Sequence, residues 1–392
     1  MPGRPAVPGI ISPVAMRVLP VFLLWLACAA ASAQALPGAA EPPAVSARAY
    51  YLLDYRSGRA LAEKNADERI EPASLTKLMT AYVVFDAIRH GEISLAQRLK
   101  ISERAWHAPG SRMFVEPGSE VAVEDLLRGM IVQSGNDATV ALAEGVAGSE
   151  EAFVERMNRE AARMGLANSH FENATGLPSE HHLASAADLA SVAAAIIREF
   201  PQYFPLYALR EYTYNNITQY NRNRLLGHDP YVDGMKTGFT ESAGFCLVAT
   251  AQRNDRRLIS VVIDSESDSG RAADAQKLLN YGFESFDTFR LYAKGQSVRE
   301  LPIWKGVRDT FQAGLNTDLY VTIPKGLGVR LRATLESMQP LLAPIRAGDR
   351  VGKLLLSLDG RPYGEYPVVS LENITMASLM VRAWHSLRLL MN

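Results

Sequence analysis

The order of strand and helix patterns along the chain constrains its fold more than any other feature. Residues 50–54 are apolar and aromatic, and the pattern continues over 59–63 after a turn, which predicts a β-hairpin. Residues 244–252 and 257–264, joined by Asn254-Asp255, predict a second hairpin. Helical patterns fill the long stretch between the hairpins. Strands at both ends with helices between them predict an antiparallel sheet that carries a helical cluster, an α+β fold.

The predicted helices have recognisable boundaries. For two of them, a serine that can cap a helix stands at the start, and glycine or proline stands at the end. The helices are expected over 76–89, from Ser149 to Gly165, from Ser185 to Pro201 and over about 272–283. With the two hairpins they make up one predicted domain, residues 47–286.

The patterns change at about residue 291. Short alternating apolar runs, separated by turns that contain glycine, predict a small all-β domain over residues 291–370. The last stretch, 374–392, has apolar residues at three- and four-residue steps, which predicts an amphipathic helix. Arg382, His385 and Arg388 lie off its apolar stripe.

An apolar run near the N-terminus has the features of a secretory signal. It spans residues 18–31, follows two arginines and leads into small-residue cleavage sites. We therefore expect residues 1–35 to be a signal peptide that is cleaved near residues 33–35. The alternative is a transmembrane anchor, but the run is short for a bilayer core of about 30 Å. Residues 36–46, rich in Ala, Pro and Gly, are expected to be a flexible segment.

Cysteine content and charge narrow the possible classes of protein. Without the predicted leader, Cys246 is the one cysteine, so the exported chain is expected to have no internal disulfide. A chain of this length can bury enough apolar surface to fold without one. The 41 basic and 42 acidic residues nearly balance, and no basic stripe predicts binding to nucleic acid.

Three short motifs carry candidate chemistry in the first domain. They are Ser74-Leu75-Thr76-Lys77, Ser134-Gly135-Asn136 and Lys236-Thr237-Gly238.

In the first motif, Ser74 lies near the predicted start of a helix and Lys77 one turn later on the same face. A serine becomes nucleophilic when a base takes its proton, and a lysine can be that base only when it is neutral. Burial, a helix N-terminus and a second cation, Lys236, would each lower the pKa of Lys77. A surface serine beside a solvated lysine is the alternative interpretation of this motif alone.

The second motif falls between helical stretches at 123–132 and 138–146. A short loop there can present Ser134 and Asn136 to a cleft. Ser134 would pass a proton to a leaving amine, and Asn136 would hydrogen-bond a substrate amide and fix the lysine. The alternative is that either residue only caps the next helix.

The third motif precedes a strand that contains glycine. A lysine and a hydroxyl at a strand edge can hold a carboxylate, and Gly238 would let a substrate backbone lie close. The alternative is an ordinary turn before a strand.

With three longer segments, these motifs resemble the low-molecular-mass penicillin-binding proteins, which are serine-type D-alanyl-D-alanine carboxypeptidases. The segments are 133–138 (QSGNDA), 173–177 (NATGL) and 233–240 (DGMKTGFT). The resemblance extends from about residue 47 to the C-terminus. It implies a β-lactamase/transpeptidase-like catalytic domain over 47–286, followed by the β domain and the terminal helix.

The resemblance also implies a reaction. A peptidoglycan peptide that ends in D-Ala-D-Ala would lose its terminal D-alanine through an acyl-enzyme, and β-lactams would be trapped as inhibitors. Ser74 would be acylated, Lys77 would be the base and Ser134 would assist. The backbone N–H groups of Ser74 and Phe239 would form the oxyanion hole. The implied substrate-binding residues are Asn136, Lys236, Thr237, Gly238, Phe239 and, near the carboxylate pocket, Arg271.

Neither a metal nor another cofactor is needed for this chemistry. The adjacent His181 and His182 are interpreted as a surface pair, because the sequence has no H-E-x-x-H motif.

Rival functions stay open. A β-lactamase of class A directs its deacylating water with a glutamate. The nearest match to that family's E-x-x-L-N motif is 180–184, where Ala184 replaces Asn, so Glu180 is interpreted as a surface residue. A peptidoglycan endopeptidase would use the same residues as a carboxypeptidase. A non-catalytic cell-wall scaffold would work through the β domain instead.

The terminal helix has two interpretations. Its apolar stripe, Trp384 and the arginines fit an interfacial membrane anchor, while core packing is the alternative. We favour the anchor because the helix follows a β module at the C-terminus of an exported chain. The expected location is therefore the periplasmic face of the bacterial inner membrane, with peripheral attachment.

Overall fold

The computed structural model of the protein describes residues 38–391, so the predicted signal peptide lies outside the described residues. Residues 38–46 form neither helix nor strand. Tyr281 donates a hydrogen bond to the Ala40 carbonyl, and Ser46 donates to the Asp274 carboxylate. The described part of the segment predicted as flexible is thus tied to helix α8 (Asp268–Ser285).

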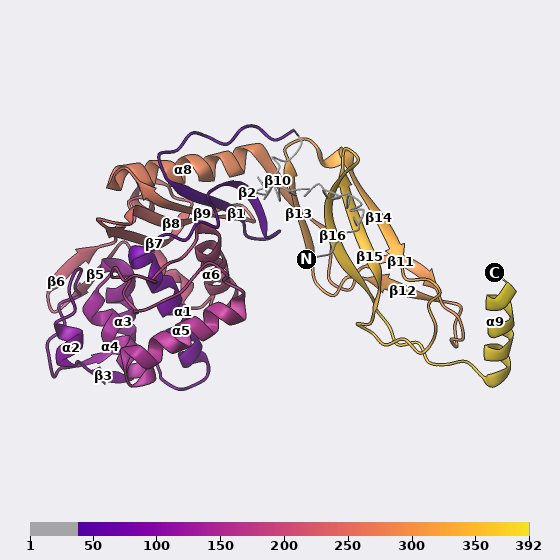
Figure 1. Cartoon of the computed structure of the whole chain (residues 1–392), viewed down its shortest axis with the longest axis horizontal. Helices are drawn as coiled ribbons and strands as arrows, with labels where there is room; N and C mark the ends of the chain where they lie inside the picture. The colour runs from indigo at the N-terminus through magenta and orange to yellow at the C-terminus, as the bar shows by residue number, and fades with distance from the viewer. Residues whose placement is uncertain (1–37, 392) are drawn as a thin grey trace, which may run out of the picture. The chain divides into compact units, whose positions relative to one another are not determined.

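The first domain is built on a five-stranded antiparallel sheet in the order β2-β1-β9-β8-β7 (Figure 1). The strands are β1 (Ala49–Asp54), β2 (Arg59–Lys64), β7 (Val232–Thr240), β8 (Gly244–Arg253) and β9 (Arg256–Ser265). Both predicted hairpins are confirmed, and β1 also pairs with β9. Strands from the two ends of the domain therefore share one sheet, and β7 lies at its edge.

Helices cover both faces of this sheet. Figure 1 shows α8 on one face and a cluster that includes α1, α3, α4, α5 and α6 on the other. The cluster consists of η1 (Ala73–Thr76), α1 (Lys77–Arg89), α2 (Glu103–Trp106), α3 (Val123–Arg128), the π-helical η2 (Gly129–Gln133), α4 (Asn136–Ala147), α5 (Glu150–Met164), α6 (Ala186–Glu199), η3 (Phe204–Ala208) and α7 (Leu225–His228). Two small two-stranded antiparallel sheets complete it: β3 (Arg98–Lys100) with β4 (Glu120–Ala122), and β5 (Glu211–Tyr214) with β6 (Ile217–Tyr220).

Local signals place the helix ends as predicted. Ser149 caps α5 by accepting from the Ala152 N–H, and α5 ends before Gly165, which has a left-handed backbone. Ser185 caps α6 in the same way. The α8 helix begins earlier than predicted, because Ser267 caps it.

The apolar cores differ on the two faces. The larger core, which includes Tyr82, Phe85 and Phe153, belongs to the helical cluster and its side of the sheet. A smaller core includes Leu52 from β1 and Leu278 from α8. Burial of this apolar surface is the main force that holds the layers together.

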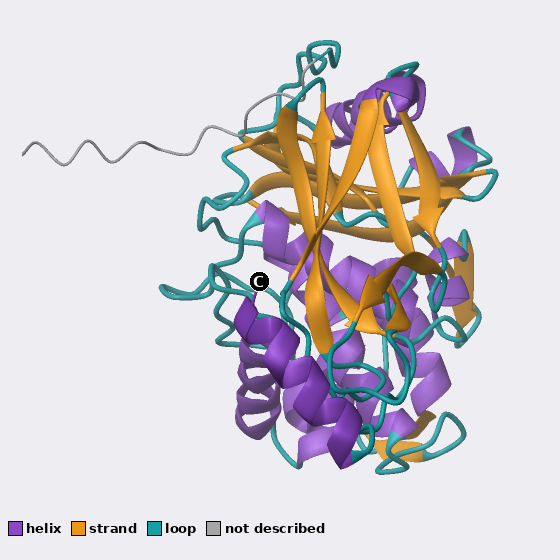
Figure 2. Cartoon of the chain, turned by 90° about the vertical axis from the view of Figure 1, so that its right-hand side faces the viewer, coloured by secondary structure: helices purple, strands orange, loops and turns teal. Residues whose placement is uncertain are grey.

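The chain from residue 286 onward is mostly β, as Figure 2 shows. A five-stranded sheet has the order β11-β12-β16-β15-β14, and β10 pairs with β13. The strands are β10 (Phe286–Tyr292), β11 (Ser297–Pro302), β12 (Thr310–Gly314), β13 (Leu319–Pro324), β14 (Leu331–Ser337), β15 (Arg350–Leu358) and β16 (Arg361–Ser370), with the short helix η4 (Gly328–Arg330) between β13 and β14. The core of this β domain is apolar and includes Phe311, Val321 and Leu354.

The C-terminal helix α9 (Leu379–Met391) is shorter than the helix predicted from residue 374. The reason is that Ile374 and Met376 form β-bridges with Ile345 and Gly306, which holds them in extended backbone.

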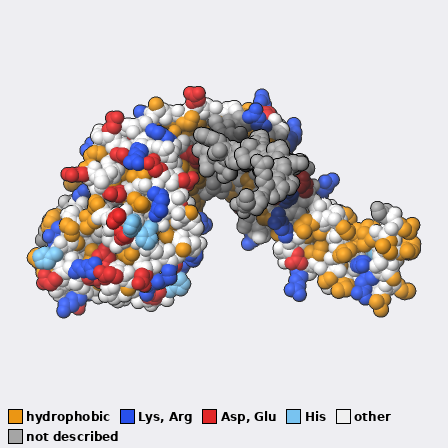
Figure 3. All heavy atoms as spheres, in the orientation of Figure 1, with side chains coloured by type: hydrophobic (Ala, Val, Ile, Leu, Met, Phe, Trp, Pro, Cys, Tyr) orange, Lys and Arg blue, Asp and Glu red, His pale blue; other side chains and the backbone are white. Residues whose placement is uncertain are grey.

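Most apolar side chains of α9 face solvent (Figure 3). The exposed set is Leu379, Met380, Val381, Trp384, Leu387, Leu390 and Met391. His385 is the buried residue of the helix, and its Nδ1 accepts a hydrogen bond from the Lys305 N–H. Within residues 38–391, no helix has the length and apolar character required to cross a bilayer.

Candidate active site

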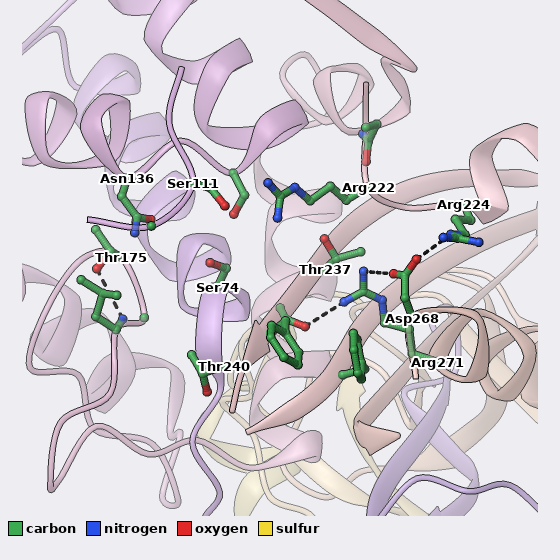
Figure 4. A pocket seen from close by; sticks show the side chains of 18 of the residues that line it. Ser74, Ser111, Asn136, Thr175, Arg222, Arg224, Thr237, Thr240, Asp268 and Arg271 are labelled. Atoms are coloured by element: carbon green, nitrogen blue, oxygen red, sulfur yellow. Dashed lines mark hydrogen bonds and ion pairs between the residues drawn. The ribbon is translucent and has the colours of Figure 1, made fainter. Parts of the chain in front are cut away.

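The three motifs meet in one cleft of about 820 Å³ beside β7 (Figure 4). Its lining includes Ser74; Ser111, Ser134 and Asn136; Thr175, Gly176 and Leu177; Tyr220, Arg222 and Arg224; Thr237, Gly238, Phe239 and Phe245; and Asp268 and Arg271. In Figure 4, Ser74 lies between Asn136 and Thr175 on one side and Thr237 on the other. Lys77 and Lys236 lie beneath this lining and are almost fully buried.

Ser74 and Lys77 are brought together by a change of helix type. Ser74 is in the 3₁₀ turn η1, and Lys77 is the first residue of α1. The Lys77 Nζ atom lies 3.0 Å from Ser74 Oγ. The sequence spacing predicted this contact, although it predicted an α-helical start rather than a 3₁₀ turn.

Lys77 has two further partners that can only accept hydrogen bonds. Its Nζ donates to Asn136 Oδ1 at 2.7 Å and to the Thr175 carbonyl at 2.7 Å. A neutral amine has two N–H groups and one lone pair. If these two oxygens take both N–H groups, the lone pair is directed at the Ser74 hydroxyl, which is the arrangement that a general base requires.

Burial and, to a smaller extent, the positive charge of Arg222 lower the pKa of Lys77 to about 7. The carboxylates of Asp137 and Glu150 act in the opposite direction. Sequence analysis assigned the role of the second cation to Lys236, whereas the structure identifies Arg222. A lysine with a pKa near neutrality can change its protonation state during a reaction.

Ser134 has an unusual backbone. It ends the π-helical η2 in the left-handed region, with φ +67°. That conformation costs a non-glycine residue about 1–2 kcal/mol. The Lys236 Nζ donates to Ser134 Oγ at 2.9 Å, so the strained turn aims this hydroxyl at a cation.

The helix-cap interpretation of the second motif is wrong. The N-cap of α4 is Gly135, and no side chain makes a capping hydrogen bond there. Asn136 uses its amide elsewhere, because Oδ1 accepts from Lys77 and Nδ2 donates to the Pro109 carbonyl at 2.5 Å. Both side chains are thus available to the site.

Lys236 is held inside the protein by β7. Burial lowers its pKa well below the ordinary value, and the charges of Lys77, Arg222 and Arg271 act in the same direction. Besides Ser134, its Nζ donates to the Thr237 carbonyl at 3.0 Å.

Gly238 packs tightly against the turn that carries Ser74. A Cβ there would lie 3.1 Å from the Pro72 carbonyl and 3.2 Å from the Leu75 nitrogen. The absent side chain therefore makes room for the turn that carries Ser74, while its predicted role in letting a substrate backbone lie close stays a prediction.

Arg271 is also at the site, because its Nη1 donates to the Gly238 carbonyl at 2.9 Å. It forms an ion pair with Asp268, which in turn pairs with Arg224 at 2.6 Å. Arg271 is buried and lines the cleft beside the third motif, while its role near a substrate carboxylate stays a prediction.

Phe239 is half exposed and packs its ring on Phe245, with ring centroids 4.4 Å apart. Its backbone belongs to β7 next to the cleft. The oxyanion hole formed by the N–H groups of Ser74 and Phe239 stays a prediction.

Sequence analysis missed two parts of the site. In Figure 4, the Arg222 side chain points into the cleft toward Ser111. Arg222 is the first missed part and the Thr175 carbonyl is the second. A backbone oxygen is present at every residue, so residue types cannot predict which one contacts the site. The 173–177 pattern pointed to the segment but not to this contact.

Two other expectations can be compared with the structure. The interpretation of His181 and His182 as a surface pair is wrong for His182, which is buried and hydrogen-bonded to Thr76. Glu180 is exposed, as expected. In the described part of the chain, no group of His, Cys, Asp and Glu side chains is arranged to hold a metal ion.

Comparison with known families gives two matches. Residues 37–267 match the family model described as D-alanyl-D-alanine carboxypeptidase. Residues 286–376 match the model described as penicillin-binding protein 5, C-terminal domain.

Several relatives are similar over most of the chain. The D-alanyl-D-alanine carboxypeptidase DacC of Escherichia coli is 40% identical over 352 residues, which cover 88% of each chain. DacA of Haemophilus influenzae is 39% identical over 359 residues, 90% of this chain and 91% of the relative.

Solved structures of penicillin-binding proteins are also similar to this chain. Penicillin-binding protein 5 of Haemophilus influenzae superimposes with a TM-score of 0.83 at 39% identity, over 86% of this chain and 99% of that chain. An ampicillin-bound penicillin-binding protein D2 of Listeria monocytogenes covers 62% of this chain and 100% of its own, with a TM-score of 0.58 at 30% identity.

Proposed function

The chain belongs to the family of serine-type D-alanyl-D-alanine carboxypeptidases, and we propose that Ser74, Lys77 and Ser134 carry out its reaction on peptidoglycan peptides that end in D-Ala-D-Ala. One observation carries the proposal: Lys77 Nζ lies 3.0 Å from Ser74 Oγ, while Asn136 and the Thr175 carbonyl occupy its two other directions. This geometry prepares the amine to receive the serine proton.

In the first step, Ser74 Oγ attacks the carbonyl between the two D-alanines as its proton moves to Lys77. The negative charge that develops on the carbonyl oxygen is stabilised by the backbone N–H groups of Ser74 and Phe239. Such donors contribute about 2.7–4 kcal/mol each in comparable sites. The proton then passes from Lys77 through the Ser134 hydroxyl to the leaving amine, and D-alanine departs.

In the second step, water hydrolyses the acyl-enzyme. Lys77 is neutral again once its proton has passed to the leaving amine, so it takes a proton from the attacking water. The ester bond to Ser74 breaks, the serine oxygen regains a proton from Lys77, and the shortened peptide is released. The same amine therefore acts as base in both steps.

The basic side chains of Lys236, in β7, and Arg271, beside that strand, suit the terminal carboxylate of the substrate. We assign this carboxylate to Thr237 and Lys236, with Arg271 close to the same strand. Arg271 is already committed to the Gly238 carbonyl and to Asp268. The aromatic pair of Phe239 and Phe245 borders the same cleft.

The cleft also favours a carboxypeptidase over a class A β-lactamase. Among the described residues that line it, the one carboxylate is Asp268, which is paired with Arg224 and Arg271. A glutamate that directs a deacylating water is not part of this lining. A β-lactam is therefore expected to acylate Ser74 and to leave slowly. An endopeptidase would require the same groups, so the crosslinked peptide is a substrate to test beside the free pentapeptide.

The decisive experiment is mass spectrometry after incubation with penicillin. We expect one penicilloyl adduct, located on the peptide that contains Ser74, and release of D-alanine from a synthetic pentapeptide. Ser74→Ala is expected to lose both, and Ser111→Ala, a hydroxyl in the same cleft, is the matched control that keeps the adduct. Labelling at another residue, or none in the folded wild-type protein, would refute the assignment.

We further propose that the mature protein is exported and attaches peripherally to the inner membrane through α9. The exposed apolar side chains of α9, with Trp384 among them and Arg382 and Arg388 on the same helix, support this location. In vesicle sedimentation, Trp384→Ser combined with Leu387→Ser should weaken binding of the mature chain. Val329→Ser, which removes an exposed apolar side chain outside α9, is the control. Equal binding of all three proteins would exclude the helix as the anchor.

A further inference from the structure

His182 is a buried histidine that the proposed reaction does not use. It lies between the two segments that surround Lys77. Its Nε2 atom is 2.8 Å from Thr76 Oγ1, the residue before Lys77. Its Nδ1 atom accepts from the backbone N–H groups of Glu172 at 3.0 Å and Asn173 at 3.4 Å.

These contacts determine the tautomer of the ring. Both backbone partners of Nδ1 are donors, so Nδ1 must carry a lone pair. Nε2 therefore carries the hydrogen and donates it to Thr76 Oγ1. Burial, with smaller effects from the charges of His170 and Lys77, lowers the pKa of His182 to about 4 although Glu172 acts in the opposite direction, so the ring is neutral at pH 7.

The loop that follows these N–H groups presents the Thr175 carbonyl to Lys77. Ala174 at its centre donates its N–H to Glu150 at 3.0 Å and accepts at its carbonyl from Thr80 at 2.7 Å. Gly176 is packed tightly, since a Cβ there would lie 1.8 Å from the Ala73 carbonyl. The loop is therefore held at each residue, and His182 holds its first two.

We propose that His182 is a positioning residue that keeps the Thr175 carbonyl against Lys77 and thereby directs the amine lone pair at Ser74. The inference rests on the proposed role of Lys77. The imidazole bridges the 172–177 loop and the Ser74–Lys77 turn, and no other side chain contacts Thr76 Oγ1 and the N–H groups of 172 and 173 together in the described hydrogen bonds.

Three substitutions of His182 separate its two bonds. In His182→Asn, the side-chain oxygen takes nearly the position of Nδ1 and keeps the acceptor for the loop. In His182→Gln, the amide reaches the position of Nε2 but leaves the loop N–H groups without an acceptor. His182→Phe removes both bonds at similar size, and His181→Asn, at the exposed neighbour, is the control.

The readout is acylation by penicillin, resolved into the dissociation constant of the initial complex and the first-order rate constant of acylation. For His182→Gln and His182→Phe we expect the rate constant to fall by about 10²-fold with the dissociation constant unchanged, since a displaced catalytic group has an effect of this order. His182→Asn should stay close to the wild-type rate constant, and His181→Asn should equal it.

A wild-type rate constant in His182→Gln would overturn the proposal, as would an equal loss in His182→Asn and His182→Gln. A weaker initial complex with an unchanged rate constant would also overturn it, because that result indicates a role in the shape of the cleft alone. The Asn and Gln variants decide the question even if the Phe variant does not fold. Failure of the wild-type protein to be acylated at Ser74 would instead refute the proposed function, which separates the two failures.

Discussion

The two larger regions of the protein bury different kinds of side chain. Near the cleft, the first domain buries charged and polar groups, among them Lys77, Asn136, Asp137, His182 and Lys236. In the β domain the described core is apolar, and the buried polar side chains of its strands are Thr322 and Ser370. Burying a charge costs several kcal/mol unless partners compensate for it, so a region that only has to be stable avoids it.

The buried charged groups near the cleft have hydrogen-bond partners that compensate for their burial. Asp137, fully buried, accepts from the N–H groups of Met113 and Phe114 at 2.8 Å each. Lys77 and Lys236 each have oxygen acceptors within 3.0 Å. We infer from this difference that the buried polar side chains near the cleft are kept for the reaction, while burial of apolar side chains stabilises both regions.

Among the buried groups of the first domain, Lys77 is expected to have the largest effect on the reaction when it is replaced. Lys77→Ala should lower the rate of acylation by penicillin by about 10²–10⁴-fold, the usual contribution of a general base. Stopped-flow measurement with a fluorescent penicillin would check this. Lys353→Ala, at a partly exposed lysine of β15, is the control and should keep the wild-type rate. Equal rates in both variants would show that the buried lysine is not the base.

The pH dependence of acylation should report the same buried amine. Lys77 acts as a base only when neutral, and burial lowers its pKa to about 7. Acylation should therefore be nearly constant above pH 7 and fall about tenfold per pH unit below it, as the neutral fraction falls. A profile measured between pH 5 and 9 (about two units on each side of the pKa) that is flat through neutrality would contradict this assignment.

A smaller effect is expected from the exposed arginine over the cleft. The charge of Arg222 is the second cause, after burial, of the lowered pKa of Lys77. Arg222→Gln should therefore move the acid limb of the acylation profile to higher pH. Arg332→Gln, on β14, is the control and should leave the limb in place. A limb that does not move would show that the charge of Arg222 does not contribute, and a limb that moves to lower pH would contradict the assigned direction of its effect.

The smallest effect on rate is expected from the apolar core of the β domain. Leu354→Ala on β15 should reduce the free energy of unfolding by about 2–5 kcal/mol, as truncation of a buried leucine does. Acylation of Ser74 at a temperature where the variant is folded should match wild type. Thermal unfolding and penicillin labelling of one sample would test both. A loss of acylation in the folded variant would mean that the two regions are coupled.

Local features of the sequence predicted much of the secondary structure. The hairpins of β1 with β2 and β8 with β9, and the caps at Ser149 and Ser185, depend on residues close together in the chain. The spacing of Ser74 and Lys77 is local in the same way. Such features follow from backbone geometry and side-chain period, which neighbouring residues define.

The tertiary structure decided which groups surround Lys77. Asn136 and Thr175 are distant from Lys77 in sequence, yet both accept its hydrogen bonds. The left-handed backbone of Ser134, the burial of His182 and the place of Gly238 against the Ser74 turn also depend on packing between distant segments. The sequence alone determined the reactive residue types and their order along the chain. Their directions, burial and pKa values were decided only by the fold, because desolvation and charge act through space and not along the chain.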